Sequence, residues 1–187
     1  MSTNEGRDCQ NRRAALLEAA LANIVTHGVA GVTLRSVADS AGVALGSIGY
    51  YFGDKDGLLS AAFARFAEES AVRFASFYEG VDSLPAARAA TVEMLVATAN
   101  SRRDVILGSE LYGISLRRPR HRITLTQWTS ACRNVLHRYF YSRAVYAIDA
   151  LYEGLILHRR MRLGDYADDT LEFAVERLTP PEAYIGP

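Results

Sequence analysis

Apolar residues recur at three- and four-residue steps along nearly the whole chain, and the alternation typical of a half-buried β-strand is missing. The spacing predicts a first helix over residues 12–28, with Leu17, Leu21 and Ile24 on one face. The other expected helices lie over about 33–41, 44–51, 54–79, 84–101, 104–117, 120–140, 143–161 and 167–178. The predicted fold class is therefore all-α, with about nine helices.

The lengths of these helices change near residue 55, where short helices give way to long ones. This change predicts a small N-terminal domain over 12–55 and a larger helical body over 56–187. Residues 1–11 have no apolar core, so we expect them to form a disordered tail rather than a secretory signal.

The second and third predicted helices are short and are separated by a tight turn that contains a glycine. Ala38 is small enough to let the two helices approach, and Gly42 can adopt the positive φ that a sharp turn needs. Val43 and Ile48 are placed to fill the core, which leaves one face of the third helix outward. This pattern is typical of a helix-turn-helix, although short helical hairpins with glycine turns are common.

A longer stretch, "TLRSVADSAGVALGSIGYYFGDKDGLL", is much more specific, together with the "HGVAGV" that precedes it. Over about residues 12–60 it resembles the DNA-binding domain of the TetR family of bacterial transcriptional repressors. The positions that carry the resemblance are Thr33, Val37, Ala38, Ala41, Gly42, Val43, Gly46, Ser47, Ile48, Tyr51, Phe52, Lys55, Leu58 and Leu59. The resemblance implies a homodimeric repressor that binds a palindromic operator in double-stranded DNA and is released by a small, largely apolar ligand.

The resemblance also implies a role for the only lysine among 21 basic residues, Lys55. In the family, a lysine at this position stands in the first turn of the fourth helix and faces a DNA phosphate. The alternative is a solvated surface lysine that offsets Asp54 and Asp56. The residues expected to contact DNA are Thr33, Arg35, Leu45, Gly46, Ser47, Gly49, Tyr50, Tyr51 and Lys55.

Two positions of the third helix depart from the family's pattern. Ala44 stands where Ser or Thr often caps this helix, and Gly49 stands where many members have a tyrosine that touches a phosphate. Either Tyr50 takes over that contact, or Gly49 lets the backbone approach DNA closely. Residues 1–57 hold five basic and six acidic side chains, so affinity for DNA must come from where the basic ones are placed.

Aromatic and apolar residues of the body could line a ligand cavity, although ordinary core packing is the simpler explanation of each of them taken singly. The candidates are Phe63, Phe66, Phe74, Met94, Tyr112 and Trp128. Glu110, which lies among apolar residues, could bind a polar group of the ligand or point to solvent.

The last two helices carry apolar faces, and Gly154 lies in the middle of one of them. A glycine inside a helix costs about 0.5–1 kcal/mol relative to alanine, a cost that close packing across a two-fold axis would offset. The expected dimer interface is Ile148, Tyr152, Gly154, Leu155 and Phe173. The alternative is that Gly154 packs against a helix of its own chain.

Composition excludes several other classes of protein. The chain has 187 residues, 49% of them hydrophobic, and no net charge, and no apolar run approaches the length of a membrane span. Cys9 and Cys132 are far apart, which fits a reducing cytoplasm rather than a disulfide framework. We therefore expect a cytoplasmic protein without membrane contact.

Catalysis finds little support in the sequence. The four histidines, His27, His121, His137 and His158, have no metal-ligand spacing, and phosphate-binding loops and nucleophile elbows are missing. We expect no enzyme, no cofactor and no metal. Asp149 and Glu153 lie one helical turn apart, among residues that indicate an interface rather than an active site. One alternative function remains, which is an adaptor of the same fold that binds a protein and does not read DNA, because Leu45 and Gly49 are uncharged.

Overall fold

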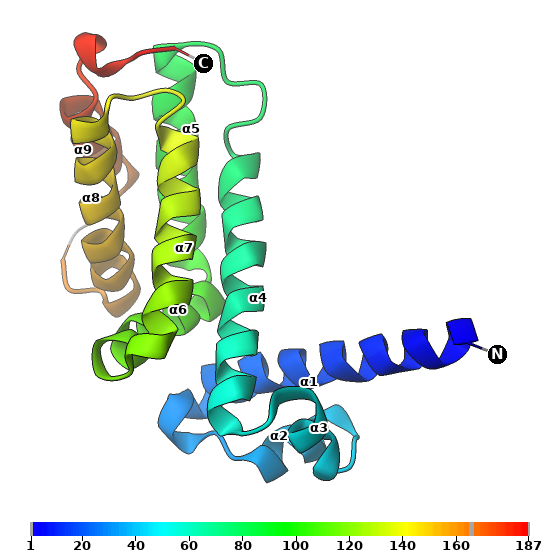
Figure 1. Cartoon of the computed structure of the whole chain (residues 1–187). Helices are drawn as coiled ribbons and strands as arrows, with labels where there is room; N and C mark the ends of the chain where they lie inside the picture. The colour runs from blue at the N-terminus through cyan, green and yellow to red at the C-terminus, as the bar shows by residue number, and fades with distance from the viewer. Residues whose placement is uncertain (1, 165–166, 187) are drawn as a thin grey trace. The chain divides into compact units, whose positions relative to one another are not determined.

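The computed structural model describes residues 2–164 and 167–186. Its helices follow each other in the order drawn in Figure 1, with no β-strand in the described part of the chain. They are α1 Ser2–Gly31, α2 Leu34–Ala41, α3 Gly46–Phe52, α4 Lys55–Ser76, α5 Leu84–Asn100, α6 Arg102–Arg117, α7 Pro119–Leu136, α8 Ser142–Met161, α9 Asp168–Leu178 and the 3-10 turn η1 Pro181–Ala183. The all-α prediction is confirmed.

The chain divides into two compact units, and the division falls inside helices rather than at residue 55. Unit 1 comprises Met1–Glu68 and Ile106–Leu125, and unit 2 comprises Glu69–Val105 and Thr126–Pro187. We expected a boundary near residue 55, whereas the first part of α4 packs onto α1. Arg65 donates a hydrogen bond to the Ala14 carbonyl (3.0 Å) and pairs with Glu18 (3.3 Å), so it ties α4 to α1.

α1 begins at Ser2, so it runs through the segment that we expected to form a disordered tail. Extending a formed helix gains one hydrogen bond for each residue that is fixed, which is far cheaper than nucleating a new helix. By length and composition alone, the part Cys9–Gly31 could cross a membrane, which the sequence did not lead us to expect. One face of this helix is buried in the structure, with Leu16, Leu21 and Ile24 inaccessible to solvent, and Arg12 and Arg13 are exposed.

α1 contains a break at Gly28, whose φ of 67° and ψ of 167° lie outside the helical region. The break frees the backbone N–H of Val29, which donates a hydrogen bond to Oε2 of Glu110 on α6 (3.2 Å). A Cβ added at Gly28 would lie 2.8 Å from Oε1 of the same carboxylate. Glu110 therefore holds the end of α1 in unit 1.

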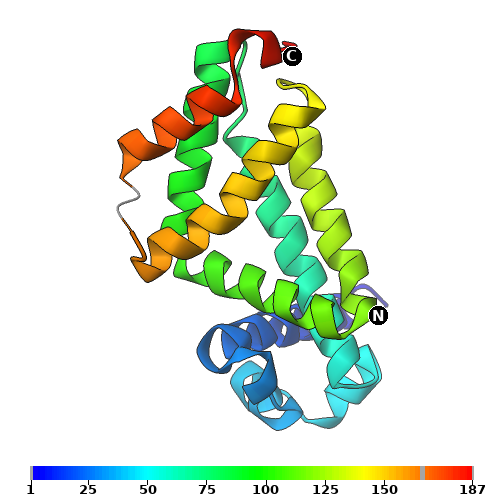
Figure 2. The same cartoon turned by 90° about the vertical axis from the view of Figure 1, so that its left-hand side faces the viewer.

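The core of unit 2 forms where α5 packs against both α8 and α9 (Figure 2). Tyr78 and Tyr139 stack at its centre with ring centroids 5.3 Å apart, and the Tyr139 hydroxyl donates a hydrogen bond to the Tyr78 carbonyl (3.1 Å). The Tyr78 hydroxyl in turn bonds to Thr91 (2.8 Å), so these buried polar groups are satisfied. Ile148 and Leu155 of α8 belong to this core.

Candidate nucleic-acid interface and ligand pocket

α2 begins and ends with the caps that its sequence predicts. Ser36 donates its backbone N–H to Thr33 Oγ1 (3.0 Å), and Thr33 donates its own N–H to Ser36 Oγ (3.3 Å), so the two residues cap each other. At the other end, Gly42 has a φ of 64°, and the N–H of Val43 donates to the Ala38 carbonyl (3.1 Å). The tight turn expected at Gly42 is therefore present, and it joins α2 to α3.

α3 turns one side into unit 1 and leaves the other side open. Ile48 is fully buried, whereas Leu45 is 45% exposed and Tyr50 is 82% exposed. Gly46 and Gly49 are exposed as well, and Ser47 is half-buried. The outward face therefore combines a hydroxyl, an apolar side chain and a tyrosine with two glycines where the backbone itself is accessible. No side chain caps the first turn of α3, as expected from Ala44.

The start of α4 presents Lys55, which pairs with no acidic side chain in the described part of the chain. Asp54 caps the helix by accepting the N–H of Gly57 (2.7 Å), which confirms the expected cap. Asp56 pairs with Arg118 and with Arg120 (3.5 Å). Both neighbouring carboxylates are thus engaged elsewhere, and no acidic side chain among the described residues lies within 4.0 Å of Lys55. A helix N-terminus and an uncompensated ammonium together favour an anion.

The other expected DNA-contacting residues lie in the same unit. Arg35 is exposed on α2, and Tyr51 is half-buried with its ring 5.0 Å from that of Tyr50. A hydrogen bond with Cys9 is the main cause that raises the pKa of Tyr51. Arg13 stacks over Phe52 at 5.5 Å from its centroid, a contact that the sequence did not indicate.

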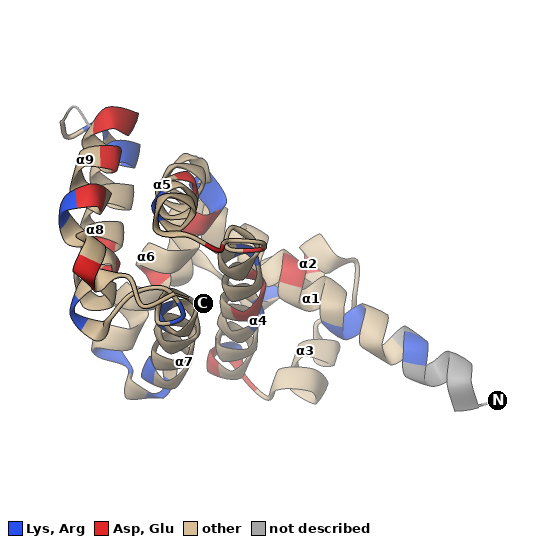
Figure 3. Ribbon diagram, turned by 90° about the horizontal axis from the view of Figure 1, so that it is seen from above, with Lys and Arg blue, Asp and Glu red and all other residues tan. Residues whose placement is uncertain are grey.

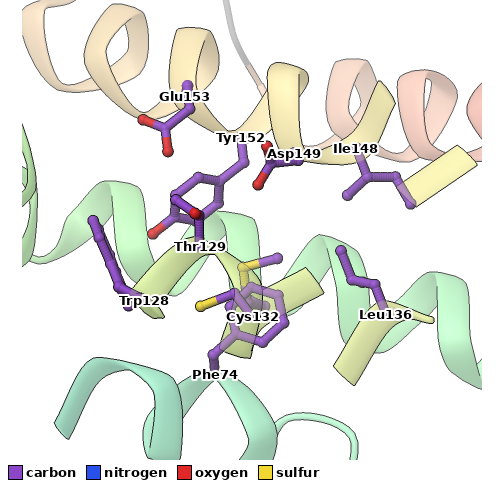
Figure 4. A pocket seen from close by; sticks show the side chains of 10 residues that line it. Phe74, Trp128, Thr129, Cys132, Leu136, Ile148, Asp149, Tyr152 and Glu153 are labelled. Carbon is purple, nitrogen blue, oxygen red and sulfur yellow. The ribbon is translucent and has the colours of Figure 1, made fainter. Parts of the chain in front are cut away.

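Three of the expected ligand-binding residues meet at one cavity in unit 2 (Figure 4). Phe74, Met94 and Trp128 line it, together with Thr129, Cys132, Leu136, Ile148, Asp149, Tyr152 and Glu153. The cavity measures about 20 Å³, and about 350 Å³ when all the space between its lining atoms and the adjoining solvent is counted. A cavity of about 10–15 Å³ holds a single water, so the pocket is nearly closed in this conformation.

The cavity carries two carboxylates that the sequence analysis assigned to an interface. Asp149 and Glu153 face it from α8 on either side of the Tyr152 ring (Figure 4), and Asp149 pairs with Arg133 (2.6 Å). Burial, followed by the charges of Asp149 and Glu153, raises the pKa of the Cys132 thiol to about 12. Burial is also the main cause that raises the pKa of Tyr152, with Cys132 and Glu153 adding to it. Positions 149, 152 and 153 share one helix face, and this spacing is the feature of the sequence that could have predicted a common site.

The other four expected ligand-binding residues lie in unit 1, and their role in ligand binding stays a prediction. Phe63 and Phe66 are buried in unit 1, where Phe63 meets the edge of His121 at 6.3 Å between ring centroids. Glu110 accepts the hydrogen bond from Val29 described above, and Tyr112 also belongs to unit 1. None of these four lines the cavity. The apolar stripe on α4 serves two different cores, and the part of α6 that carries Glu110 and Tyr112 belongs to unit 1.

The predicted dimer interface is corrected in part. Ile148 and Leu155 are buried in the core of their own chain, and Tyr152 lines the cavity, so these three present little surface to a partner. Gly154 is exposed, and a Cβ added there would meet no atom within 4 Å, so it does not pack against its own chain. Phe173 on α9 is 60% exposed, with Arg177 stacked 5.2 Å from its centroid.

Five exposed residues of α8 lie on one face, which shares only Gly154 with the predicted interface. They recur at three- and four-residue steps, which forms a single stripe. This stripe consists of Tyr146, Ala150, Gly154, His158 and Met161. In the part of the chain that the structure describes, no three His, Cys, Asp or Glu side chains gather closely enough to hold a metal ion.

Known proteins share both the N-terminal sequence and the fold. Residues 16–62 match the family model described as bacterial regulatory proteins, tetR family. The transcriptional regulator SCO7518 of Streptomyces coelicolor A3(2) is 32% identical, and the match covers 90% of this chain and 98% of SCO7518 with a TM-score of 0.84. The chain belongs to the TetR family. The TetR-type helix-turn-helix is thus formed by α2 and α3, with α1 and the start of α4 beside them.

Other relatives of this TetR-family protein carry more specific descriptions. The HTH-type transcriptional regulator BetI of Paraburkholderia xenovorans is 54% identical over 50 residues, which are 27% of this chain and only 26% of the length of BetI. The multidrug binding protein EbrR in complex with ethidium is 27% identical with a TM-score of 0.75, and the match covers 89% of this chain and 97% of EbrR. EbrR in complex with proflavin is 26% identical with a TM-score of 0.71, and the match covers 89% of this chain and 99% of EbrR.

Proposed function

We propose that this protein is a sequence-specific DNA-binding regulator, and that it represses transcription until an effector releases it from its operator. The observation that carries the proposal is the outward face of α3, with Leu45, Ser47 and Tyr50 accessible beside an uncompensated Lys55. A hydroxyl can bond to a base edge, an apolar side chain can meet a thymine methyl, and an ammonium can bind a phosphate. Its place of action would be the cytoplasm.

Selection of duplexes from a random DNA library tests this function. We expect the full-length protein to enrich one palindromic motif, and we expect the variant Ser47→Ala to enrich a different one. Enrichment of no motif by the wild-type protein would overturn the proposal and favour the adaptor of the same fold.

A homodimer is part of the proposal, because a palindrome offers two equal half-sites to two recognition helices. Support comes from the stripe of α8, in which Tyr146 and Met161 are large, exposed and apolar, and from Phe173 on α9. Exposed apolar residues that gather on one face indicate an interaction surface rather than scattered surface positions. Light scattering on the purified protein tests this part, and a monomer at micromolar concentration would contradict it.

The effector that we propose is an aromatic cation, rather than the largely apolar ligand expected from the sequence. Phe74, Trp128 and Tyr152 offer aromatic rings to the cavity. Glu153 borders it as a second carboxylate beside Asp149, whose charge is balanced by Arg133. Aromatic faces attract cations, and carboxylates at a cavity with apolar walls strengthen this preference. The ethidium and proflavin complexes of EbrR support the same chemistry, since both dyes are planar aromatic cations.

The cavity must open before such an effector can enter, because ligand pockets usually measure about 300–1,000 Å³. A neighbouring recess of about 200 Å³ in unit 2 shares two lining residues with the cavity, Phe74 and Tyr152. Rotation of these two rings would join the two spaces. Closure of the cavity in the structure is therefore compatible with an effector site that opens on binding.

A pair of probes with the same shape and opposite charge tests the charge preference. We expect tetraphenylphosphonium to quench or shift the fluorescence of Trp128, the only tryptophan, and tetraphenylborate to leave it unchanged. The variant Glu153→Gln should weaken binding of the cation about tenfold or more, whereas the exposed control Glu172→Gln should not. Equal binding of both probes would refute the proposed charge preference.

A further inference from the structure

Four arginines stand where α6 meets α7, in the sequence "RRPRHR" (Figure 3). We call residues 117–122 the arginine turn. All four arginines of the turn are exposed, and they are Arg117, Arg118, Arg120 and Arg122. They lie outside the helix-turn-helix, yet they form one of the densest runs of positive charge in the chain.

The arginine turn is fixed to the first turns of α4 within unit 1. Arg118 and Arg120 both pair with Asp56, the residue that follows Lys55. Next to them, Nδ1 of His121 lies 3.5 Å from the hydroxyl of Ser60, and its ring meets Phe63. The contacted residues of α4 lie at positions 56, 60 and 63, which form one helix face. The two guanidinium groups are therefore held beside the end of α4 that begins with Lys55.

Unit 1 needs this charge if it is to bind DNA well. It contains ten basic and eight acidic residues, and without the arginine turn only six basic residues would remain against the same eight acidic ones. Neutralised phosphates release counterions, and this release supplies most of the affinity that does not depend on sequence. The arginine turn thus changes the sign of the net charge of the unit that carries the recognition helix.

We propose that Arg118 and Arg120, positioned by Asp56, bind DNA phosphates next to the phosphate expected at Lys55. The DNA-binding surface then extends beyond the helix-turn-helix to the turn between α6 and α7. A guanidinium has five N–H donors, so pairing with Asp56 leaves donors that can reach a phosphate. Phosphates follow one another about every 3.4 Å of helix axis along a strand, so neighbouring cations on the protein can meet successive phosphates. This inference rests on the proposed function, because it presumes that unit 1 binds DNA.

The test measures binding of the full-length protein to its selected duplex by fluorescence anisotropy at several salt concentrations. We expect R118A/R120A to lower the slope of log affinity against log salt by about two, since each phosphate contact contributes about 0.9. The preferred sequence should stay the same, because phosphates carry no sequence information. The variant R118K/R120K keeps the charge and should retain most of the slope, and far-UV circular dichroism should show equal helix content for all variants.

A matched control lies in the same turn. R117A/R122A removes the same charge, but among the described residues neither arginine pairs with a carboxylate of α4, so its slope should change by clearly less than that of R118A/R120A. Equal effects of the two double variants would mean that only net charge matters, and would overturn the proposal.

A second control separates direct contact from masking of the Asp56 charge. In the background D56N no carboxylate needs masking, so R118A/R120A should still lower the slope if the arginines touch phosphates. An unchanged salt slope in the D56N background would overturn the proposal. A wild-type salt slope for R118A/R120A alone would also overturn it, and would instead favour an acidic protein as the partner of the arginine turn. If the wild-type protein selects no duplex at all, the proposed function fails rather than the role of the turn.

Discussion

Replacing Gly28 by alanine should destabilise unit 1 through two separate effects. The backbone conformation, with φ 67° and ψ 167°, is essentially restricted to glycine, and a side chain there costs about 1–3 kcal/mol. The new Cβ would also lie 2.8 Å from Oε1 of Glu110, so the flexible carboxylate must move away. That movement gives up its hydrogen bond with the N–H of Val29, a bond to a charged group worth about 1.5 kcal/mol at the low end of its range.

The two effects predict a definite pattern for three variants. With about 2 kcal/mol for the backbone and about 1.5 kcal/mol for the hydrogen bond, Gly28→Ala should lower the free energy of unfolding by about 3.5 kcal/mol. Glu110→Ala should lower it by about 1.5 kcal/mol, because it removes only the hydrogen bond. The double variant should lose no more than Gly28→Ala alone, since the same bond cannot be lost twice. The coupling between the two sites is thus about 1.5 kcal/mol.

Urea unfolding followed by far-UV circular dichroism measures these differences. Gly113→Ala is the matched control on α6, where a new Cβ would lie 3.5 Å from an Arg117 nitrogen, an ordinary contact. It should leave stability unchanged or raise it by up to about 1 kcal/mol, as expected for glycine to alanine inside a helix. Full additivity of Gly28→Ala and Glu110→Ala, or a neutral Gly28→Ala, would refute the role given to this contact.

Three further predictions concern DNA, pH and assembly. Lys55→Ala should weaken binding to all duplexes about equally and lower the salt slope by about one. Ser47→Ala should instead change the preferred sequence. The reverse pattern in anisotropy titrations would be incompatible with α3 as the recognition helix. Burial lowers the pKa of His121, with Asp56 opposing and Arg120 and Arg118 assisting, so the neutral ring is favoured in the folded state. The stability of the wild-type protein relative to His121→Leu should therefore fall as the pH drops below the unfolded value of about 6.5, and urea curves with equal pH dependence would argue against it. Gly154→Leu should weaken the dimer without loss of helix content, because single chains leave open space there; light scattering that finds an unchanged mass would exclude Gly154 from the interface.

Local sequence was sufficient to predict the helix-turn-helix. The cap at Thr33, the positive φ at Gly42 and the burial of Ile48 depend on neighbours within a few residues, so their pattern can be read along the chain. The helical spacing of apolar residues likewise predicted most of the helix bounds. The sequence pattern did not predict the N-terminal extension of α1, because an existing helix can be extended without a cap or an apolar stripe in the added residues.

The ligand pocket depended on information that the sequence does not hold. A helical stripe predicts which side of α4 is buried but not which neighbour covers it, so Phe63 and Phe74 could not be assigned to different units. In the same way, the spacing of Asp149 and Glu153 shows that they share a face. Only the packing of α7 against that face shows that they border a cavity rather than a partner.

The solitary lysine has a practical consequence for chemical labelling. Reagents that acylate amines can modify only one side chain of this sequence, that of Lys55, which is partly accessible and lies in the first turn of α4. A phosphate held against the ammonium would shield it from acylation. The extent of a single acylation event, read by mass spectrometry, therefore becomes a footprint of operator occupancy that requires no engineered label.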